Sequence, residues 1–179
     1  MSQELLWNLQ EKKELLGREI ILAGEPFQNE VKLLMTIKGI TPLTALAFLS
    51  DIGDITRFKS LRKMDAYLGL VPKSKDSGGK SKPGHINRES RKLTRTILTQ
   101  SVFHISNSSS YLNNFYSDLT KKRGAGRARI ALIRKICGIM RRMLLTGKEF
   151  RWVDKKLYEK KFKQYEKTLN QLKEERKSA

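Results

Sequence analysis

The stretch LLMTIKGITPLTALAFL, residues 33–49, decides the fold that the sequence predicts. Two apolar runs at helical spacing flank the turn KGITP, which is the form of a helix-hairpin-helix element. Gly39 supplies the tight turn and Lys38 adds a positive charge, while Thr41 stands where such turns usually have a second glycine. Backbone N–H groups at the start of the second helix, helped by the helix dipole, can bind a phosphate. The alternative is a helix turn that serves only as a packing unit.

Helical periodicity continues on both sides of this stretch. The segments that we expect to be helical are 5–20, 31–37, 57–68, 88–106, 111–122, 130–147 and the Lys/Glu-rich tail from Trp152. One apolar stripe in the late part of the chain consists of Ile130, Ile133, Ile136, Cys137, Met140, Met143 and Leu144. No run alternates as convincing strands would. The sequence therefore predicts a mainly α protein, with a compact domain over residues 30–150 and helical extensions over residues 1–29 and 151–179.

The charge of the chain narrows the class of partner. Its 179 residues hold 37 Lys and Arg against 18 Asp and Glu, a net charge of +19 with a pI near 10.2. This balance is typical of nucleic-acid binding, and a ribosome-type or membrane-surface protein is the alternative. Residues 1–30 are acidic, whereas residues 73–103 hold eight Lys or Arg against two acids and residues 124–152 hold eight against one. The acidic N-terminal helix suits a protein partner better than DNA.

Several classes of protein are excluded by simple features. No apolar run is long enough to span a membrane, and the acidic, amphipathic N-terminus is not a signal peptide. The lone Cys137 excludes an intrachain disulfide and a Cys-rich zinc site. We therefore expect a soluble cytoplasmic protein, associated with the nucleoid, that has no membrane partner.

The segment KSKDSGGKSKPGH, residues 73–85, is longer than a usual connection. Its glycine pair and Pro83 break helices and strands, so we expect an arm without regular structure over residues 73–83. Ser77 beside the glycines can approach a phosphodiester closely, because glycine leaves no side-chain wall. The cations expected to contact nucleic acid here are Lys73, Lys75, Lys80, Lys82, His85, Arg88, Arg91, Lys92 and Arg95. The alternative is a solvated linker.

Metal ligands are not indicated by the pattern. Asp51 and Asp54 in DIGDITRF could share a metal, but caps of neighbouring helix ends are the better interpretation. His85 and His104 cannot form a metal or general-base cluster with Cys137 on spacing alone. We therefore expect no metal site and no cofactor in this chain.

Basic residues recur every seven positions along the late helix, at Arg127, Arg134, Arg141 and Lys148. This spacing places them on one face, roughly opposite the apolar stripe. A solvated face is one interpretation. The near absence of acidic residues favours a face that follows phosphates.

The order of these motifs resembles the C-terminal half of transposases of the IS110/IS116/IS902 type. The matching residues are IKGITPLTALAFLSDIGDITRFKSLRKMDAYLGLVPKSKDSGGKSKPGHINRESRKLTR, over 37–95, and NNFYSDLTKKRGAGRARIALIRKI, over 113–136. Five motifs within these residues carry the resemblance. They are the hairpin turn at Gly39–Ile40, the turn at Asp51–Phe58, the segment Tyr67–Pro72, the Ser77–Gly78 pair and the segment Gly84–Ile86 that leads into the basic helix. The resemblance covers about residues 30–150, and residues 1–29 resemble the end of the coiled coil that precedes this region in the family.

The resemblance implies a division of chemistry between two parts. In this family an N-terminal RuvC-like domain carries a DEDD set of metal-binding acids, and the C-terminal domain carries a serine that forms a phosphoserine link to DNA. By position this serine is Ser77, with Ser74 as the fallback. The stretch ahead of residue 30 is too short to hold the RuvC-like domain, so the divalent metal is expected only on that missing domain. The chain is then either a truncated transposase or a standalone product that works with a separate RuvC-like subunit.

Three functions follow from these observations. The first is the DNA-binding, serine-bearing domain of an IS110-type transposase, which self-associates and uses a structured guide RNA as family members do. The second is a non-enzymatic helix-hairpin-helix DNA-binding or regulatory protein derived from such a transposase. The third is an RNA-binding accessory protein, because Lys-rich helices bind RNA and DNA alike without base readout.

Overall fold

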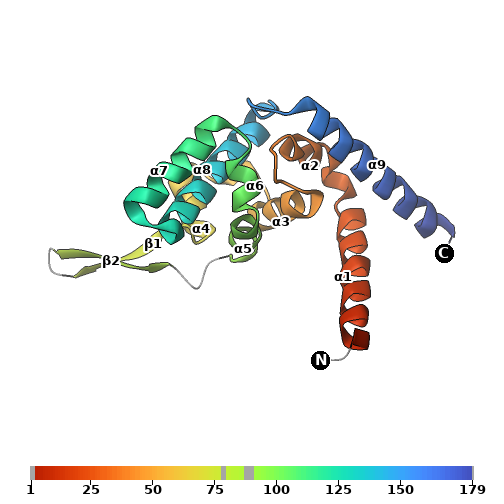
Figure 1. Ribbon diagram of the computed structural model, residues 1–179, viewed down its shortest axis with the longest axis horizontal. Helices are drawn as coiled ribbons and strands as arrows, with labels where there is room; N and C mark the ends of the chain where they lie inside the picture. The colour runs from red at the N-terminus through yellow and green to blue at the C-terminus, as the bar shows by residue number, and fades with distance from the viewer. Residues whose placement is uncertain (1–2, 78–79, 87–90, 179) are drawn as a thin grey trace.

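The computed structural model describes residues 3–77, 80–86 and 91–178, with side chains described outside 72–90. The chain is mainly helical, which confirms the predicted fold class (Figure 1). The α-helices are α1 (Gln3–Ala23), α2 (Gln28–Met35), α3 (Pro42–Ile52), α4 (Leu61–Tyr67), α5 (Leu93–Gln100), α6 (Val102–Ser106), α7 (Ser110–Arg123), α8 (Ala125–Thr146) and α9 (Lys155–Ser178). Two short 3-10 turns, η1 (Glu25–Phe27) and η2 (Ile55–Arg57), and two strands, β1 (Pro72–Ser77) and β2 (Lys80–Ile86), complete the fold.

The stretch over residues 33–49 forms two helices joined by a turn, as its pattern predicts. Thr41 caps α3, because its hydroxyl accepts a hydrogen bond from the Thr44 N–H at 3.2 Å, and Pro42 follows at the first helical position. Gly39 has a φ of 91°, in the region that favours glycine. Most of α3 is buried, so this helix lies at the centre of the molecule.

The core is built around α8, which contacts α2, α4, α5, α6 and α7. The predicted apolar stripe forms its buried face, while Ile130 and Leu144 lie half-buried at the margin. The buried side chains of α8 are Ala128, Leu132, Ile133, Ile136, Cys137, Met140 and Met143. Removing one such aliphatic side chain from water stabilises a fold by about 1.5–3 kcal/mol, so the stripe accounts for the position of α8.

The helix expected over residues 88–106 differs from the structure. Residues 91–92 are not helical, α5 begins at Leu93, and a second short helix, α6, follows it. The cause is a contact with α3: the Asp51 carboxylate accepts hydrogen bonds from the Thr94 N–H at 2.9 Å and the Thr94 hydroxyl at 2.7 Å. This carboxylate acts as a cap from a distant part of the chain and fixes where the helix starts.

The expectation of an irregular arm over residues 73–83 is wrong. β1 and β2 pair antiparallel, with Lys75 opposite Lys82 and Ser77 opposite Lys80. Two glycines separate the strands in the sequence, which is a recognised hairpin signal. Pro83 is compatible with this ribbon, because each strand of a two-stranded sheet has one unpaired edge. The hairpin projects from the helical body (Figure 1).

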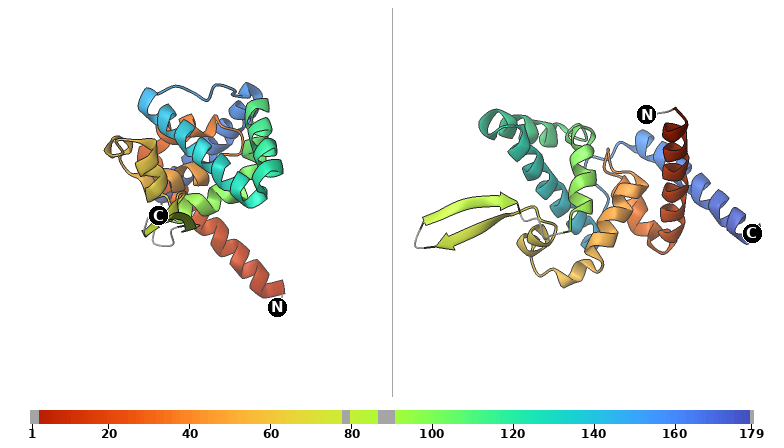
Figure 2. Two further views of the ribbon diagram at one scale, coloured as in Figure 1. Left: turned by 90° about the vertical axis from the view of Figure 1, so that its left-hand side faces the viewer. Right: turned by 90° about the horizontal axis from the view of Figure 1, so that it is seen from below.

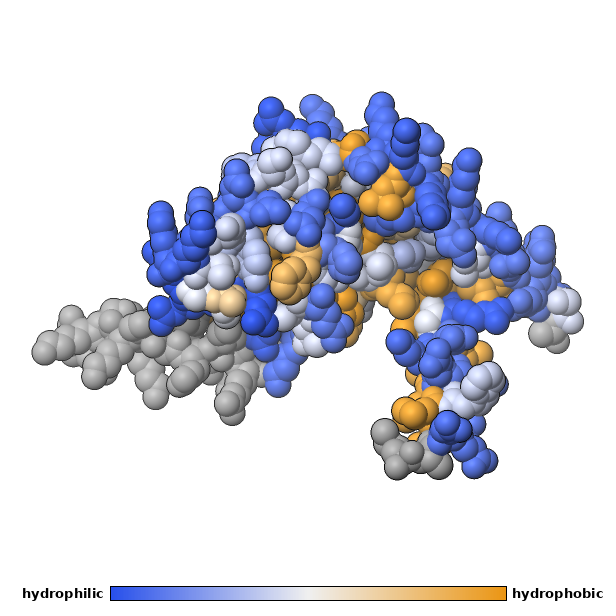
Figure 3. Space-filling model, viewed as in Figure 1, coloured by the Kyte–Doolittle hydropathy of each residue, from blue (hydrophilic) through white to orange (hydrophobic). Residues whose placement is uncertain are grey.

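The two terminal helices diverge from each other at the opposite end of the molecule (Figure 1). α9 joins the core through Tyr165 and Leu169, whereas α1 has no buried residue. Arg18 of α1 forms an exposed ion pair with Glu175 of α9. Figure 3 shows apolar surface along α1. The exposed large apolar side chains of α1 are Leu5, Leu6, Trp7, Leu9, Leu15, Leu16 and Ile20.

Candidate nucleic-acid interface

The hairpin carries both candidate nucleophiles. Ser77 is the last residue of β1, opposite the first residue of β2, and so lies at the far end of the ribbon. Ser74 lies closer to the helical body, opposite Pro83. The predicted cations Lys73, Lys75, Lys80, Lys82 and His85 belong to the same ribbon, whereas Arg88 lies outside the described residues. One element therefore brings together most of the site that the sequence predicted over residues 73–85.

Two arginines meet Tyr67 near the base of the hairpin. The Arg57 guanidinium lies 4.6 Å from the centre of the Tyr67 ring, and its hydrogen bonding lowers the pKa of that phenol. Arg91 makes a smaller contribution of the same sign, and its backbone N–H donates to the Tyr67 carbonyl at 3.3 Å. Arg91 remains exposed, so a cation is available beside the strands.

Two predicted cations lie at the start of α5, and only one of them is exposed. Lys92 is exposed. Arg95 donates from Nη1 to the Gly69 carbonyl at 3.0 Å, at the turn that follows α4. Arg95 therefore fastens α5 to this turn.

The turn between α2 and α3 is closely packed. A Cβ on Gly39 would lie 2.8 Å from the His104 Cβ and 2.9 Å from the Ile105 nitrogen, so α6 covers this side of the turn. Thr41 already accepts from one N–H of α3 and Pro42 has none, so the first turn of α3 offers fewer free donors than a glycine-rich form of the motif. Lys38 is exposed. The phosphate-binding role of this turn stays a prediction.

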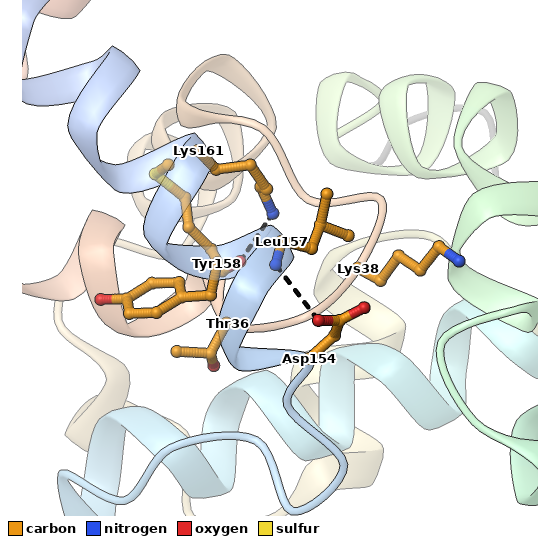
Figure 4. A pocket seen from close by; sticks show the side chains of 7 residues that line it. Thr36, Lys38, Asp154, Leu157, Tyr158 and Lys161 are labelled. Atoms are coloured by element: carbon orange, nitrogen blue, oxygen red, sulfur yellow. Dashed lines mark hydrogen bonds between the residues drawn. The ribbon is translucent and has the colours of Figure 1, made fainter.

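A small cavity lies on the other side of the same turn (Figure 4). Its volume of about 10 Å³ approaches the space of one water molecule and is too small for a substrate. Lys161 of α9 donates to the carbonyls of Met35, at 2.6 Å, and Ile37, at 3.2 Å. Burial lowers the pKa of Lys161 to about 8. The residue joins α9 to the α2–α3 turn.

The arginines spaced every seven residues along α8 do not share one environment. Arg127 is exposed. Arg134 donates from Nε to the buried Asp65 carboxylate at 3.1 Å, and burial raises the pKa of Asp65 while Arg134 opposes that rise. Arg141 donates to the Phe58 carbonyl at 2.8 Å. These two arginines contact the elements around α4, whereas Arg127 and Lys148, which share the spacing, are exposed.

Sequence reasoning selected one cation at the junction of α7 and α8 and missed its neighbours. Lys121, Lys122, Arg123 and Arg129 are exposed beside Arg127. The signal was present, because residues 119–134 contain no Asp or Glu. A run of cations without acidic residues in the sequence therefore identifies the α7–α8 junction as a basic surface.

The described residues hold no group of three or more His, Cys, Asp or Glu side chains arranged for a metal ion. Asp54 accepts from the Thr56 N–H at 2.8 Å and caps the 3-10 turn η2. The helix expected over residues 57–68 is shorter in the structure, because α4 begins at Leu61 and Ser60 is its cap. Among the same residues, none of the helices combines the length and the apolar character that crossing a membrane requires.

Comparison of the sequence with known proteins finds similarity to transposases. Residues 31–117 match the family described as Transposase IS116/IS110/IS902. The chain is 28% identical over 153 residues to the transposase for insertion sequence element IS1111A of Coxiella burnetii, which covers 82% of this chain and 42% of that protein. It is 26% identical over 147 residues to a probable family 20 transposase of Pseudomonas aeruginosa, which covers 76% of this chain and 44% of that protein.

A third relative matches over a shorter stretch, at a higher sequence identity than the first two. The chain is 37% identical over 67 residues to the transposase for insertion sequence element IS1328 of Yersinia enterocolitica, covering 37% of this chain and 20% of that protein. The chain thus spans less than half the length of these relatives.

Proposed function

We propose that the chain is the DNA-binding, serine-bearing part of a transposase, because residues 31–117 match the IS116/IS110/IS902 family of transposases. The observation that carries this proposal is the β-hairpin, which places Ser77 at the end of a strand and projects from the matched domain. The high net charge supports a polyanionic partner. DNA is the partner that the names of the relatives favour.

The proposed reaction is the cleavage of one DNA strand by Ser77. Its hydroxyl oxygen attacks the phosphorus of a phosphodiester and forms a phosphoserine bond, while the bond to one sugar oxygen breaks and that oxygen leaves with the electron pair. The serine proton passes to a base, for which we propose a group of the RuvC-like partner. A serine hydroxyl is a weak nucleophile, so it needs such a base and nearby positive charge to offset the charge of the transition state.

The remaining parts of the assembly are also proposals. A divalent metal would be held by the DEDD acids of a RuvC-like domain, on a longer form of this protein or on a separate subunit. A guide RNA and a second copy of the chain complete the arrangement that the family resemblance implies. The bacterial nucleoid is the place where such a protein meets its DNA.

The test is covalent capture of DNA in a competent assembly. The chain is combined with the RuvC-like domain of a complete relative, or residues 30–150 are grafted into that relative, and adducts are separated on denaturing gels. We expect Ser77→Ala to abolish the adduct while DNA affinity changes less than about twofold, because the serine acts in the transition state. Ser81→Ala, on β2, is the matched control and should keep the adduct.

Two results would change the assignment. An adduct that survives Ser77→Ala but disappears with Ser74→Ala would move the nucleophile to Ser74. An adduct that needs neither serine would favour the second function, in which the chain binds DNA or regulates transposition without cutting.

A further inference from the structure

Five exposed cations surround the junction between α7 and α8, and we call this group the basic corner. Its members are Lys121, Lys122, Arg123, Arg127 and Arg129. Within the described ranges, none of the five forms an ion pair with another described residue. Gly124 and Gly126 lie between them, and a Cβ at either position would meet open space. The corner therefore combines dense positive charge with a surface that a bulky partner can approach.

Part of this charge is unfavourable for the isolated chain. The three cations that end α7 are well placed, because positive charge is stabilised at a helix C-terminus. Arg127 and Arg129 instead lie in the first turns of α8, where the helix dipole disfavours positive charge. The first turn of α8 contains no acidic residue to offset them. Bound negative charge would remove this cost.

The position of the corner indicates which surface it extends. The hairpin and the α7–α8 junction project at the same end of the molecule, and the two views of Figures 1 and 2 agree on this. α9 also carries many lysines, but it lies toward the other end, and its lysines alternate with Glu159, Glu166, Glu174 and Glu175. Charge density and position both favour the corner over α9 as a second contact for whatever the hairpin binds.

We propose that the basic corner holds the sugar-phosphate backbone of duplex DNA while the hairpin contacts the same duplex. This inference rests on the proposed function and adds a second contact surface to it. α7 and α8 pack against each other, and packed helices lie roughly 10 Å apart, a length over which a duplex carries about six phosphate charges. Two or three direct phosphate contacts therefore fit the corner. Such contacts position DNA and do not read its sequence.

The experiment compares two variants of the full chain that lose the same charge. In the first, all five residues of the corner are changed to Gln. In the second, five exposed lysines of α9 are changed to Gln: Lys155, Lys156, Lys160, Lys163 and Lys167. Thermal melting followed by circular dichroism checks that both variants fold, and fluorescence anisotropy on a short duplex gives the binding constant between about 50 and 200 mM salt.

We expect the corner variant to lose about 2–3 from the slope of log K against log salt, and the α9 variant to lose less than about 1. Equal slopes in the two variants would overturn the inference and leave the Ser77 proposal standing. A loss seen on duplex RNA but not on duplex DNA would overturn it in favour of an RNA contact. A wild-type chain whose binding does not respond to salt would overturn both this inference and the DNA-binding part of the proposed function.

Discussion

At the scale of single residues, Gly39 meets two constraints at once. Its φ of 91° is costly for any residue with a Cβ, and a Cβ there would also touch the α6 backbone at 2.9 Å. We predict that Gly39→Ala destabilises the fold by about 2–4 kcal/mol, the sum of backbone strain and overpacking. Gly147→Ala is the control, because Gly147 has a φ of 65° but open space around it, so about 1 kcal/mol is expected. Urea unfolding measures both, and equal losses would show that packing on α6 adds nothing.

At the scale of elements, Lys161 joins α9 to the α2–α3 turn through two carbonyls. Burial lowers the pKa of Lys161 from 10.5 to about 8, so between these values the unfolded chain holds a proton that the folded chain has released. The free energy of unfolding should therefore rise with pH across this window. Below about pH 8 the buried ammonium group is charged, and the fold is then least stable with respect to this group. Lys161→Met should remove this contribution. Urea unfolding at both ends of the window checks it, and a difference between wild type and variant that is independent of pH would contradict it.

At the scale of the whole molecule, α1 carries an apolar stripe that none of the described residues buries. Leu9 and Leu16 are 54% and 57% exposed, and they lie seven residues apart on one face of the helix. We predict that the chain self-associates through this stripe, so that light scattering gives at least twice the monomer mass of 20.7 kDa. The double change Leu9→Gln and Leu16→Gln should lower the mass toward that of the monomer. The paired control, Lys12→Gln with Lys13→Gln, should not, and a mass unaffected by the leucine changes would argue against pairing through α1.

The candidate site was partly predictable because charge and motif order are properties of the sequence. Lys92 and Arg127 are exposed, as a role in binding requires. Arg134 and Arg141 have the same spacing as Arg127, yet they bond to Asp65 and the Phe58 carbonyl. A spacing of seven shows which residues share a helix face, but it does not show what that face contacts.

The sequence by itself determined the mainly helical class, the apolar face of α8 and the excess of positive charge. These features depend on residues within a few positions of each other, so local periodicity and capping preferences are enough to predict them. Only the tertiary structure decided that β1 pairs with β2, that the Asp51 carboxylate caps the first turn of α5 through Thr94, and that α6 covers Gly39. The contacts of Asp51 and Gly39 join residues 43 or more positions apart. The ribbon forms because the backbone groups of β1 and β2 hydrogen-bond to each other and not to water. Packing in three dimensions decides such contacts, and for the ribbon the local pattern gives only a signal, the two glycines between the strands.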